Sequence, residues 1–265
     1  MSHQFIIILI SIPGLLILSK YFIDYLKVNI SLELILDSKK INKNLKYIVQ
    51  FVILINILLL VVGCINNIFY HFNLGINHTV YSLFAISIAV YAYFFSKKKL
   101  KISNNLDLKK FFNKFRDLKF IHFVLLVIIV IYFFSVINRN FIYWNDQDEI
   151  TLYGYFTRLY AQDWILSDNI FEEQSRFIET LFSYFYLISE NFILVRFLKT
   201  FLLIGLSIIF YILIFNYTKS ISISLIGVLL FLLIPELSYV GPFSLKVDFM
   251  LFNFEILSIF FLLIL

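Results

Sequence analysis

The sequence predicts an all-α protein: a polytopic membrane helix bundle of about seven transmembrane helices, with a long outer loop that carries short interfacial helices. Hydrophobic residues make up 61% of the 265 residues, charged residues make up only 15%, and the mean hydropathy is +0.91. A soluble domain is roughly half apolar and about a quarter charged. A water-soluble globule of this size would therefore lack the polar side chains needed to cover its surface.

Seven apolar runs account for most of the chain. Each comes close to the roughly 20 residues that a helix needs to cross a hydrocarbon core of about 30 Å. Each is predicted to be a helix, because an isolated run in lipid must satisfy its own backbone hydrogen bonds. The runs cover Phe5 to about Ser19, Tyr47 to about Tyr70, Val80–Phe95, Phe120–Ile137, Phe192–Tyr217, Ile221 to about Val240, and Val247–Leu265.

The charged segments between the runs predict the orientation, because cytoplasmic loops carry an excess of Lys and Arg. Residues 20–46 hold six basic and three acidic side chains, and residues 96–119 hold nine and two. Residues 139–190 hold three Arg, no Lys and nine acidic side chains. We therefore expect a multi-pass cell-membrane protein whose N-terminus and 139–190 loop face the outer side. The net charge of +5 lies in these loops, so no nucleic-acid partner is expected.

The chain divides at residue 119 in this interpretation. Residues 1–119 form three N-terminal transmembrane helices with basic cytoplasmic loops, and residues 120–265 form the fourth helix, the acidic outer loop and three further helices. The chain ends at Leu265 inside an apolar run without a basic flank, which predicts the N-terminal part of a longer protein. A single cysteine excludes a disulfide scaffold.

Three carboxylates, those of Asp146, Asp148 and Glu149, lie within four residues just after the fourth run. One interpretation is structural: Asp146 caps a short helix over 150–161, and Glu149 stabilises its N-terminus. The other is chemical. Asp148 is then a general base for an acceptor hydroxyl or amine, or Asp146 and Asp148 hold a divalent cation such as Mg²⁺ or Mn²⁺. The spacing leaves both open.

The second half of the outer loop, Asn169–Glu190, has apolar residues at three- and four-residue steps with charged residues between them. This pattern predicts an amphipathic helix with Asn169 as its cap. The helix either lies in the membrane interface or packs on the bundle, and the pattern favours neither.

Several charged residues fall at or inside the predicted membrane. Arg196 and Lys199 are three residues apart at the outer start of the fifth run, and therefore share a helix face. Lys246 lies at a similar depth before the seventh run, close to Asp248. Glu255 follows Asp248 by seven residues, roughly 10 Å deeper. We expect an acid at that depth to face a cavity or a partner, and Asp248 and Glu255 are therefore candidate substrate-binding residues.

These features resemble the GT-C class of integral-membrane glycosyltransferases, in particular its protein O-mannosyltransferase and aminoarabinose-transferase branch. Asp148-Glu149, followed by Tyr153 and Ala161, is similar to the acidic motif of the first outer loop in that class. The stretch from Pro242 to Asp248 is similar to the later outer loop that leads into a span with an acid at its start. The resemblance covers residues 120–265.

The resemblance implies a sugar transfer from a polyprenyl-phosphate-linked donor to an acceptor at the outer face of the cell envelope. It implies that Asp148 is the general base and that Glu149 and Asp146 position the acceptor or a metal. From their depth and charge, Arg196, Lys199 and Lys246 are candidates to bind the lipid phosphate.

Two other classes of function remain open. In a transporter or lipid flippase, Asp248 and Glu255 would line a path and the outer acids would attract cations, although no internal repeat is found and Gly is scarce. In a non-catalytic membrane assembly subunit, Asp148 and Glu149 could be replaced without loss.

Overall fold

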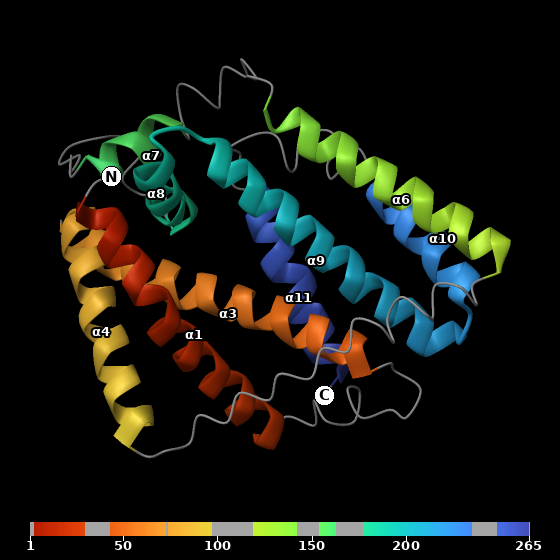
Figure 1. Ribbon diagram of the computed structural model, residues 1–265, viewed down its shortest axis with the longest axis horizontal. Helices are drawn as coiled ribbons and strands as arrows, with labels where there is room; N and C mark the ends of the chain where they lie inside the picture. The colour runs from red at the N-terminus through yellow and green to blue at the C-terminus, as the bar shows by residue number, and fades with distance from the viewer. Residues whose placement is uncertain are drawn as a thin grey trace.

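The computed structural model is all-helical in the residues that it describes (Figure 1). It describes residues 3–29, 43–72, 74–96, 119–141, 154–162, 177–234 and 248–264. The helices in these ranges are α1 (His3–Asn29), α3 (Lys43–His71), α4 (Ile76–Ser96), α6 (Phe120–Arg139), α7 (Gly154–Ala161), α8 (Phe177–Ser189), α9 (Ile193–Thr218), α10 (Ile221–Leu232) and α11 (Asp248–Ile264). The predicted polytopic helical bundle is confirmed.

Five of the described helices are long and apolar enough to cross a membrane, and they coincide with the first five predicted runs. Their apolar stretches are Ile6–Tyr25, Val49–His71, Ile76–Ser96, Phe120–Arg139 and Ile193–Thr218. α10 and α11 have 12 and 17 residues, which at 1.5 Å per residue is about 18 and about 26 Å. Both lengths are below the roughly 30 Å of a hydrocarbon core.

Two predicted boundaries are wrong. The first helix was expected to end near Ser19, but α1 continues to Asn29 and holds Pro13 in its interior. The sixth was expected to reach about Val240, but α10 ends at Leu232 and a turn follows at Leu233 and Ile234. In both cases the prediction took the end of the apolar run as the end of the helix. α1 continues into a more polar stretch, and α10 ends before its apolar run does. Residues 235–240 lie outside the described part.

α9 is the central helix of the bundle. Half of its membrane-crossing window is buried, against 11% of that of α6. The main core cluster joins α9 to α8, α10 and α11 through fully buried side chains, among them Phe182, Leu203 and Met250. α6 lies at the periphery and exposes a wholly apolar stripe in its middle, where Ile128, Ile131 and Phe134 are examples. This composition suits contact with lipid chains.

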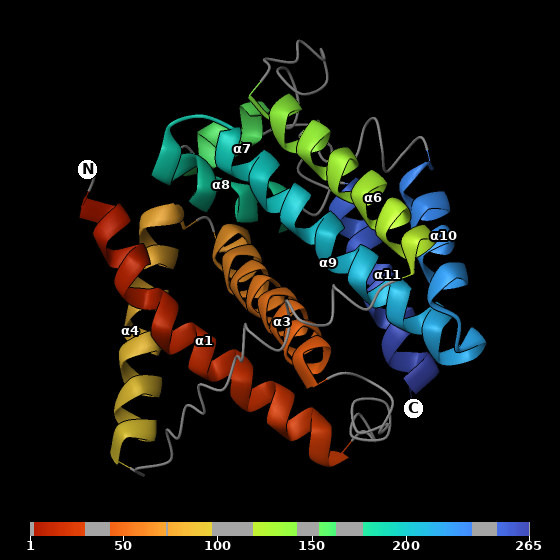
Figure 2. The same cartoon turned by 45° about the vertical axis from the view of Figure 1, so that its right-hand side comes forward.

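The helices α1 and α4 cross in backbone contact at Gly14 and Ser87. A Cβ atom at position 14 would lie 2.5 Å from the backbone oxygen and 2.7 Å from the Cα atom of Ser87. Only glycine fits this crossing, as is common where membrane helices approach closely. The two helices lie together toward their N-terminal ends and diverge beyond this crossing (Figure 2).

The helices α7 and α8, together with the first turns of α9, form one end of the bundle, which we call the loop end. The N-terminus lies at this end, and the C-terminus lies on the opposite side (Figures 1 and 2). The C-terminal ends of α1 and α4, which flank the two strongly basic segments, also lie opposite the loop end. That the loop end faces the outside of the cell remains a prediction from charge.

Candidate functional site

Arg196 and Lys199, predicted from depth and charge, lie in the first two turns of α9 at the loop end. Arg196 is 7% exposed and Lys199 is fully buried. The Lys199 ammonium nitrogen lies 5.6 Å from the centre of the Phe249 ring, at the start of α11. A cation over an aromatic face is stabilised by the ring quadrupole. α9 therefore turns its cations inward, toward α11, rather than extending them to the surface.

The end of α6 is fixed to this same stretch of α9. Asn140 is fully buried, and its side-chain NH₂ donates a 2.8 Å hydrogen bond to the Thr200 hydroxyl. That hydroxyl donates in turn to the backbone oxygen of Arg196, at 3.0 Å. The rings of Phe141 and Phe197 meet edge to face with centres 5.4 Å apart. The last described residues before the acidic segment, Asn140 and Phe141, therefore lie against the turns of α9 that carry Arg196.

The helix α7 brings a third cation to the loop end. The guanidinium carbon of Arg158 lies 5.1 Å from the centre of the Phe192 ring and 5.9 Å from that of Tyr186. Phe192 immediately precedes α9, one turn before Arg196. α7, which follows the acidic segment in sequence, therefore contacts the residue that precedes α9.

A buried polar cluster holds α8 in place. Asn66 of α3 is fully buried, and its amide donates to the backbone oxygen of Thr180 in α8. Its amide oxygen accepts hydrogen bonds from the hydroxyls of Tyr184 at 3.0 Å and Tyr160 at 3.4 Å. Burial raises the pKa of Tyr184 well above its usual value, and the hydrogen bond with Thr79 only partly opposes this. The phenol therefore stays protonated and remains a donor.

The amphipathic helix of the outer loop thus takes the second of its two predicted positions. α8 packs on the bundle, and its residues Ile178 to Tyr184 are all buried against α3, α7 and α9. Its predicted N-terminal cap, Asn169, lies outside the described residues. The other predicted loop helix, over residues 150–161, corresponds to α7, which the structure describes from Gly154 to Ala161.

The remaining predicted site residues are placed differently. Asp146, Asp148, Glu149 and Lys246 lie outside the described residues, as does the side chain of Asp248, which begins α11. The predicted acidic base and metal ligands therefore stay predictions. Within the described ranges, no group of three His, Cys, Asp or Glu side chains could hold a metal ion.

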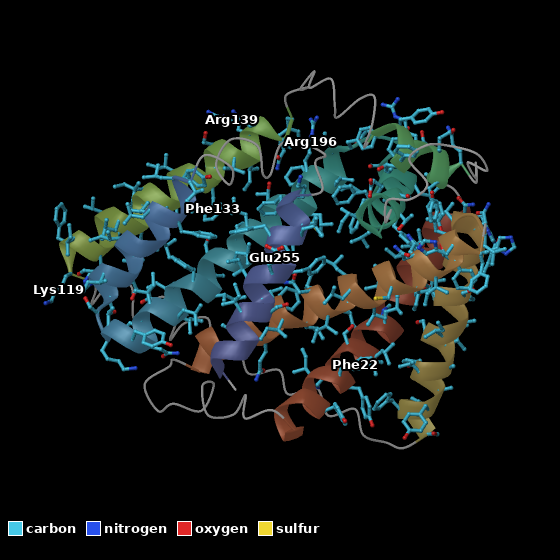
Figure 3. All side chains as sticks on the ribbon, turned by 180° about the vertical axis from the view of Figure 1, so that it is seen from behind. Phe22, Lys119, Phe133, Arg139, Arg196 and Glu255 are labelled. Atoms are coloured by element: carbon cyan, nitrogen blue, oxygen red, sulfur yellow. The ribbon has the colours of Figure 1, made fainter. Side chains whose placement is uncertain are left out.

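Glu255 lies apart from the two buried cations. Figure 3 shows Arg196 near the start of α11 and Glu255 about midway along that helix. Its side chain is exposed, whereas its neighbours Asn253 and Leu257 are buried. The predicted role of Glu255 in substrate binding is not supported by any contact with Arg196 or Lys199 among the described residues.

Sequence reasoning missed two residues of this region. Arg158 is the only basic residue between positions 140 and 175, which was a usable signal in so acidic a loop. Asn140 carried no such signal, because an Asn just after a span is ordinary. Its amide oxygen is buried and has no hydrogen-bond partner within the described part of the chain. It offers an acceptor beside Arg196.

Taken together, the described residues place two buried cations and a half-buried arginine at the loop end, together with the amide of Asn140. The three cations are donors that can hold an anion where the site is shielded from water. Comparisons with protein-family models, with curated proteins and with solved structures found no match for this chain.

Proposed function

We propose that this chain contributes to a membrane glycosyltransferase that takes a sugar from a polyprenyl-phosphate-linked donor, and that the loop end of α9 holds the phosphate of that donor. One observation carries the proposal: Arg196 and Lys199 are buried on one face of α9. The described residues on either side of the acidic segment contact the same end of that helix, Asn140 at Thr200 and Arg158 at Phe192. The cations would stabilise the leaving phosphate, and a carboxylate of the acidic segment would act as the base of the same reaction.

Positive charge at one end of α9 is the physical reason to assign an anion to this site, whatever other contacts Arg196 and Lys199 make. A charged side chain within a membrane bundle is costly and is retained where it pairs with an opposite charge or a ligand. In a site that excludes water, positive charge stabilises a leaving phosphate more strongly than it does in solution. The lipid tail of the donor would remain in the hydrocarbon, and its phosphate would lie at the level of the first turns of α9.

The chemistry follows from these roles. The oxygen of an acceptor hydroxyl forms a bond to the anomeric carbon of the sugar, and the bond between that carbon and the phosphate oxygen breaks. The hydroxyl proton passes to the Asp148 carboxylate, which is the general base. The electron pair of the broken bond leaves on the polyprenyl phosphate, whose charge Arg196 and Lys199 stabilise. A divalent cation on Asp146 and Asp148 would add to this stabilisation.

Binding of polyprenyl phosphate to the full chain in nanodiscs tests the phosphate site, with the parent polyprenol as the neutral ligand. We expect wild type to prefer the phosphate and Arg196→Gln to lose about tenfold or more of that preference, the usual scale for a hydrogen bond to a charged group. The matched control is Lys219→Gln, which removes an exposed cation at the opposite end of α9 and should leave the preference unchanged.

Release of polyprenyl phosphate from polyprenyl-phosphate mannose, followed in membranes, tests the base. Asp148→Asn should abolish release while the variant inserts and binds polyprenyl phosphate as wild type does. A transporter or an assembly subunit predicts that neither residue matters for binding or release. In that case Asp148→Asn and Arg196→Gln leave phosphate binding and release at the level of wild type, and the proposal is wrong.

A further inference from the structure

Asn140 is a buried amide that the fold satisfies only in part. Its side chain is fully buried, and its NH₂ group donates to the Thr200 hydroxyl at 2.8 Å. Its amide oxygen is also buried and makes no hydrogen bond within the described part of the chain. A buried acceptor without a donor costs free energy, which a ligand that brings a donor would recover.

The orientation of this amide follows from its partner. A hydroxyl has one hydrogen to donate, and the Thr200 hydroxyl donates it to the backbone oxygen of Arg196 at 3.0 Å. It can therefore only accept from Asn140, which places the NH₂ group toward Thr200 and the amide oxygen away from it. Turning the amide over would cost at least one of these hydrogen bonds. The group that remains available is thus an acceptor.

This acceptor lies at the proposed phosphate site. Asn140 follows α6 and contacts the third turn of α9, one turn beyond Arg196. The neighbouring rings of Phe141 and Phe197 are also in contact, with centres 5.4 Å apart. Figure 3 shows Arg196 next to the end of α6 that Arg139 marks. A ligand whose phosphate meets Arg196 therefore comes close to Asn140.

The phosphate itself cannot pair with this oxygen. The phosphodiester of a lipid-linked sugar has acceptor oxygens and no hydrogen to donate. Arg and Lys side chains only donate, so Arg196 and Lys199 are matched to the phosphate, whereas the oxygen of Asn140 is matched to a donor on the group that the phosphate carries. In a sugar, the hydroxyl nearest to the phosphate is the 2-hydroxyl, on the carbon next to the anomeric carbon.

We propose that the amide oxygen of Asn140 accepts a hydrogen bond from the 2-hydroxyl of the donor sugar. Asn140 is then a specificity-determining residue, which narrows the donors to sugars with a free 2-hydroxyl. A 2-deoxy sugar would leave the buried oxygen unpaired. This assignment rests on the proposed function, because it takes the loop end of α9 as the place where the donor phosphate is held.

Two donor analogues test the contact: polyprenyl-phosphate mannose and its 2-deoxy form, each bound to the full chain in nanodiscs. We expect wild type to bind the mannose form about three- to tenfold more tightly, the scale of one neutral hydrogen bond. Asn140→Leu, which removes the oxygen with little change in volume, should bind both forms equally. The matched control is Asn138→Leu, at an exposed position of α6, which should keep the wild-type preference.

Thr200→Val separates the sugar contact from the hydrogen bond between the helices. Asn140→Leu and Thr200→Val both remove that hydrogen bond, but only Asn140→Leu removes the amide oxygen. Thr200→Val should therefore weaken the binding of both forms and still prefer the mannose form. If Thr200→Val loses the preference as completely as Asn140→Leu does, Asn140 acts only through the packing of α6 on α9, and the proposed contact is wrong.

The parent lipids distinguish failure of this contact from failure of the proposed function. Wild type could prefer polyprenyl phosphate to polyprenol and yet bind the mannose and 2-deoxy forms equally. The phosphate site would then stand, and only the role of Asn140 would be overturned. If wild type does not distinguish polyprenyl phosphate from polyprenol, the proposed function is wrong and the sugar contact is wrong with it.

Discussion

The side-chain amide of Asn140 donates a 2.8 Å hydrogen bond to the hydroxyl of Thr200, and both side chains are buried. This bond joins the residue that follows α6 to the third turn of α9, one turn beyond Arg196. It sets the position of the C-terminal end of α6 relative to the buried cations. The geometry of the candidate site therefore depends on a polar contact between helices far from the acids in sequence.

Removing this bond should weaken both the fold and the site. Asn140→Ala and Thr200→Val each delete one partner, and a double-mutant cycle should give a coupling of about 0.5 to 2 kcal/mol, as for hydrogen bonds between membrane helices. The coupling is measured from unfolding in detergent by SDS titration. Asn138→Ala, an exposed neighbour on α6, should have almost no effect. Additive single variants would show that the bond does not contribute.

The pKa of Tyr184 predicts an alkaline limit on the docking of α8. A tyrosine in the unfolded chain ionises near pH 10, and burial raises the pKa of folded Tyr184 above that value. Its contribution to stability is therefore complete below about pH 10 and is lost as the pH rises further. The free energy of unfolding should fall steadily as the pH rises above about 10, and less so in Tyr184→Phe.

The same variant tests the two hydrogen bonds of the Tyr184 hydroxyl. At neutral pH, Tyr184→Phe should lower the free energy of unfolding by about 1 to 3 kcal/mol, because it removes the buried bonds with Asn66 and Thr79 without creating a cavity. Tyr155→Phe, at an exposed position of α7, is the control. An equal alkaline loss of stability in wild type and Tyr184→Phe would mean that other groups cause it.

The crossing of α1 and α4 predicts a large difference between two glycine substitutions. In Gly14→Ala the new methyl group meets the backbone of Ser87, which cannot rotate away. In Gly227→Ala it meets the Cδ1 atom of Ile214, the far end of a flexible side chain. Gly14→Ala should therefore destabilise the protein by about 1 to 3 kcal/mol more than Gly227→Ala. Unfolding midpoints in detergent measure both, and equal midpoints would contradict this account of the crossing.

The charge of the loops predicts which side of the membrane the loop end faces. In a Cys64→Ser background, His71→Cys should react with a membrane-impermeant maleimide added outside intact cells. Lys219→Cys should react only after the membrane is opened. Both positions are exposed and lie at helix ends. Labelling of Lys219→Cys in intact cells would reverse the predicted orientation.

The sequence by itself determined the class of the fold. Hydropathy is a local property, and lipid requires each apolar run to close its own hydrogen bonds, so five membrane-length helices could be located to within a few residues of their cores. Because helix faces repeat every three to four residues, the shared face of Arg196 and Lys199 could also be predicted. The length of α10 could not, because apolar composition continues past the point where its helix ends.

The tertiary structure decided which way each polar residue faces. Lys199 and Glu255 are both charged residues within apolar helices, yet one is fully buried beside Phe249 and the other is exposed. Their difference follows from the rotation of α9 and α11, which packing and the bond between Asn56 and Asn253 fix. The sequence gives the spacing of residues along each helix. Which helix a given face packs against is decided only when the helices come together.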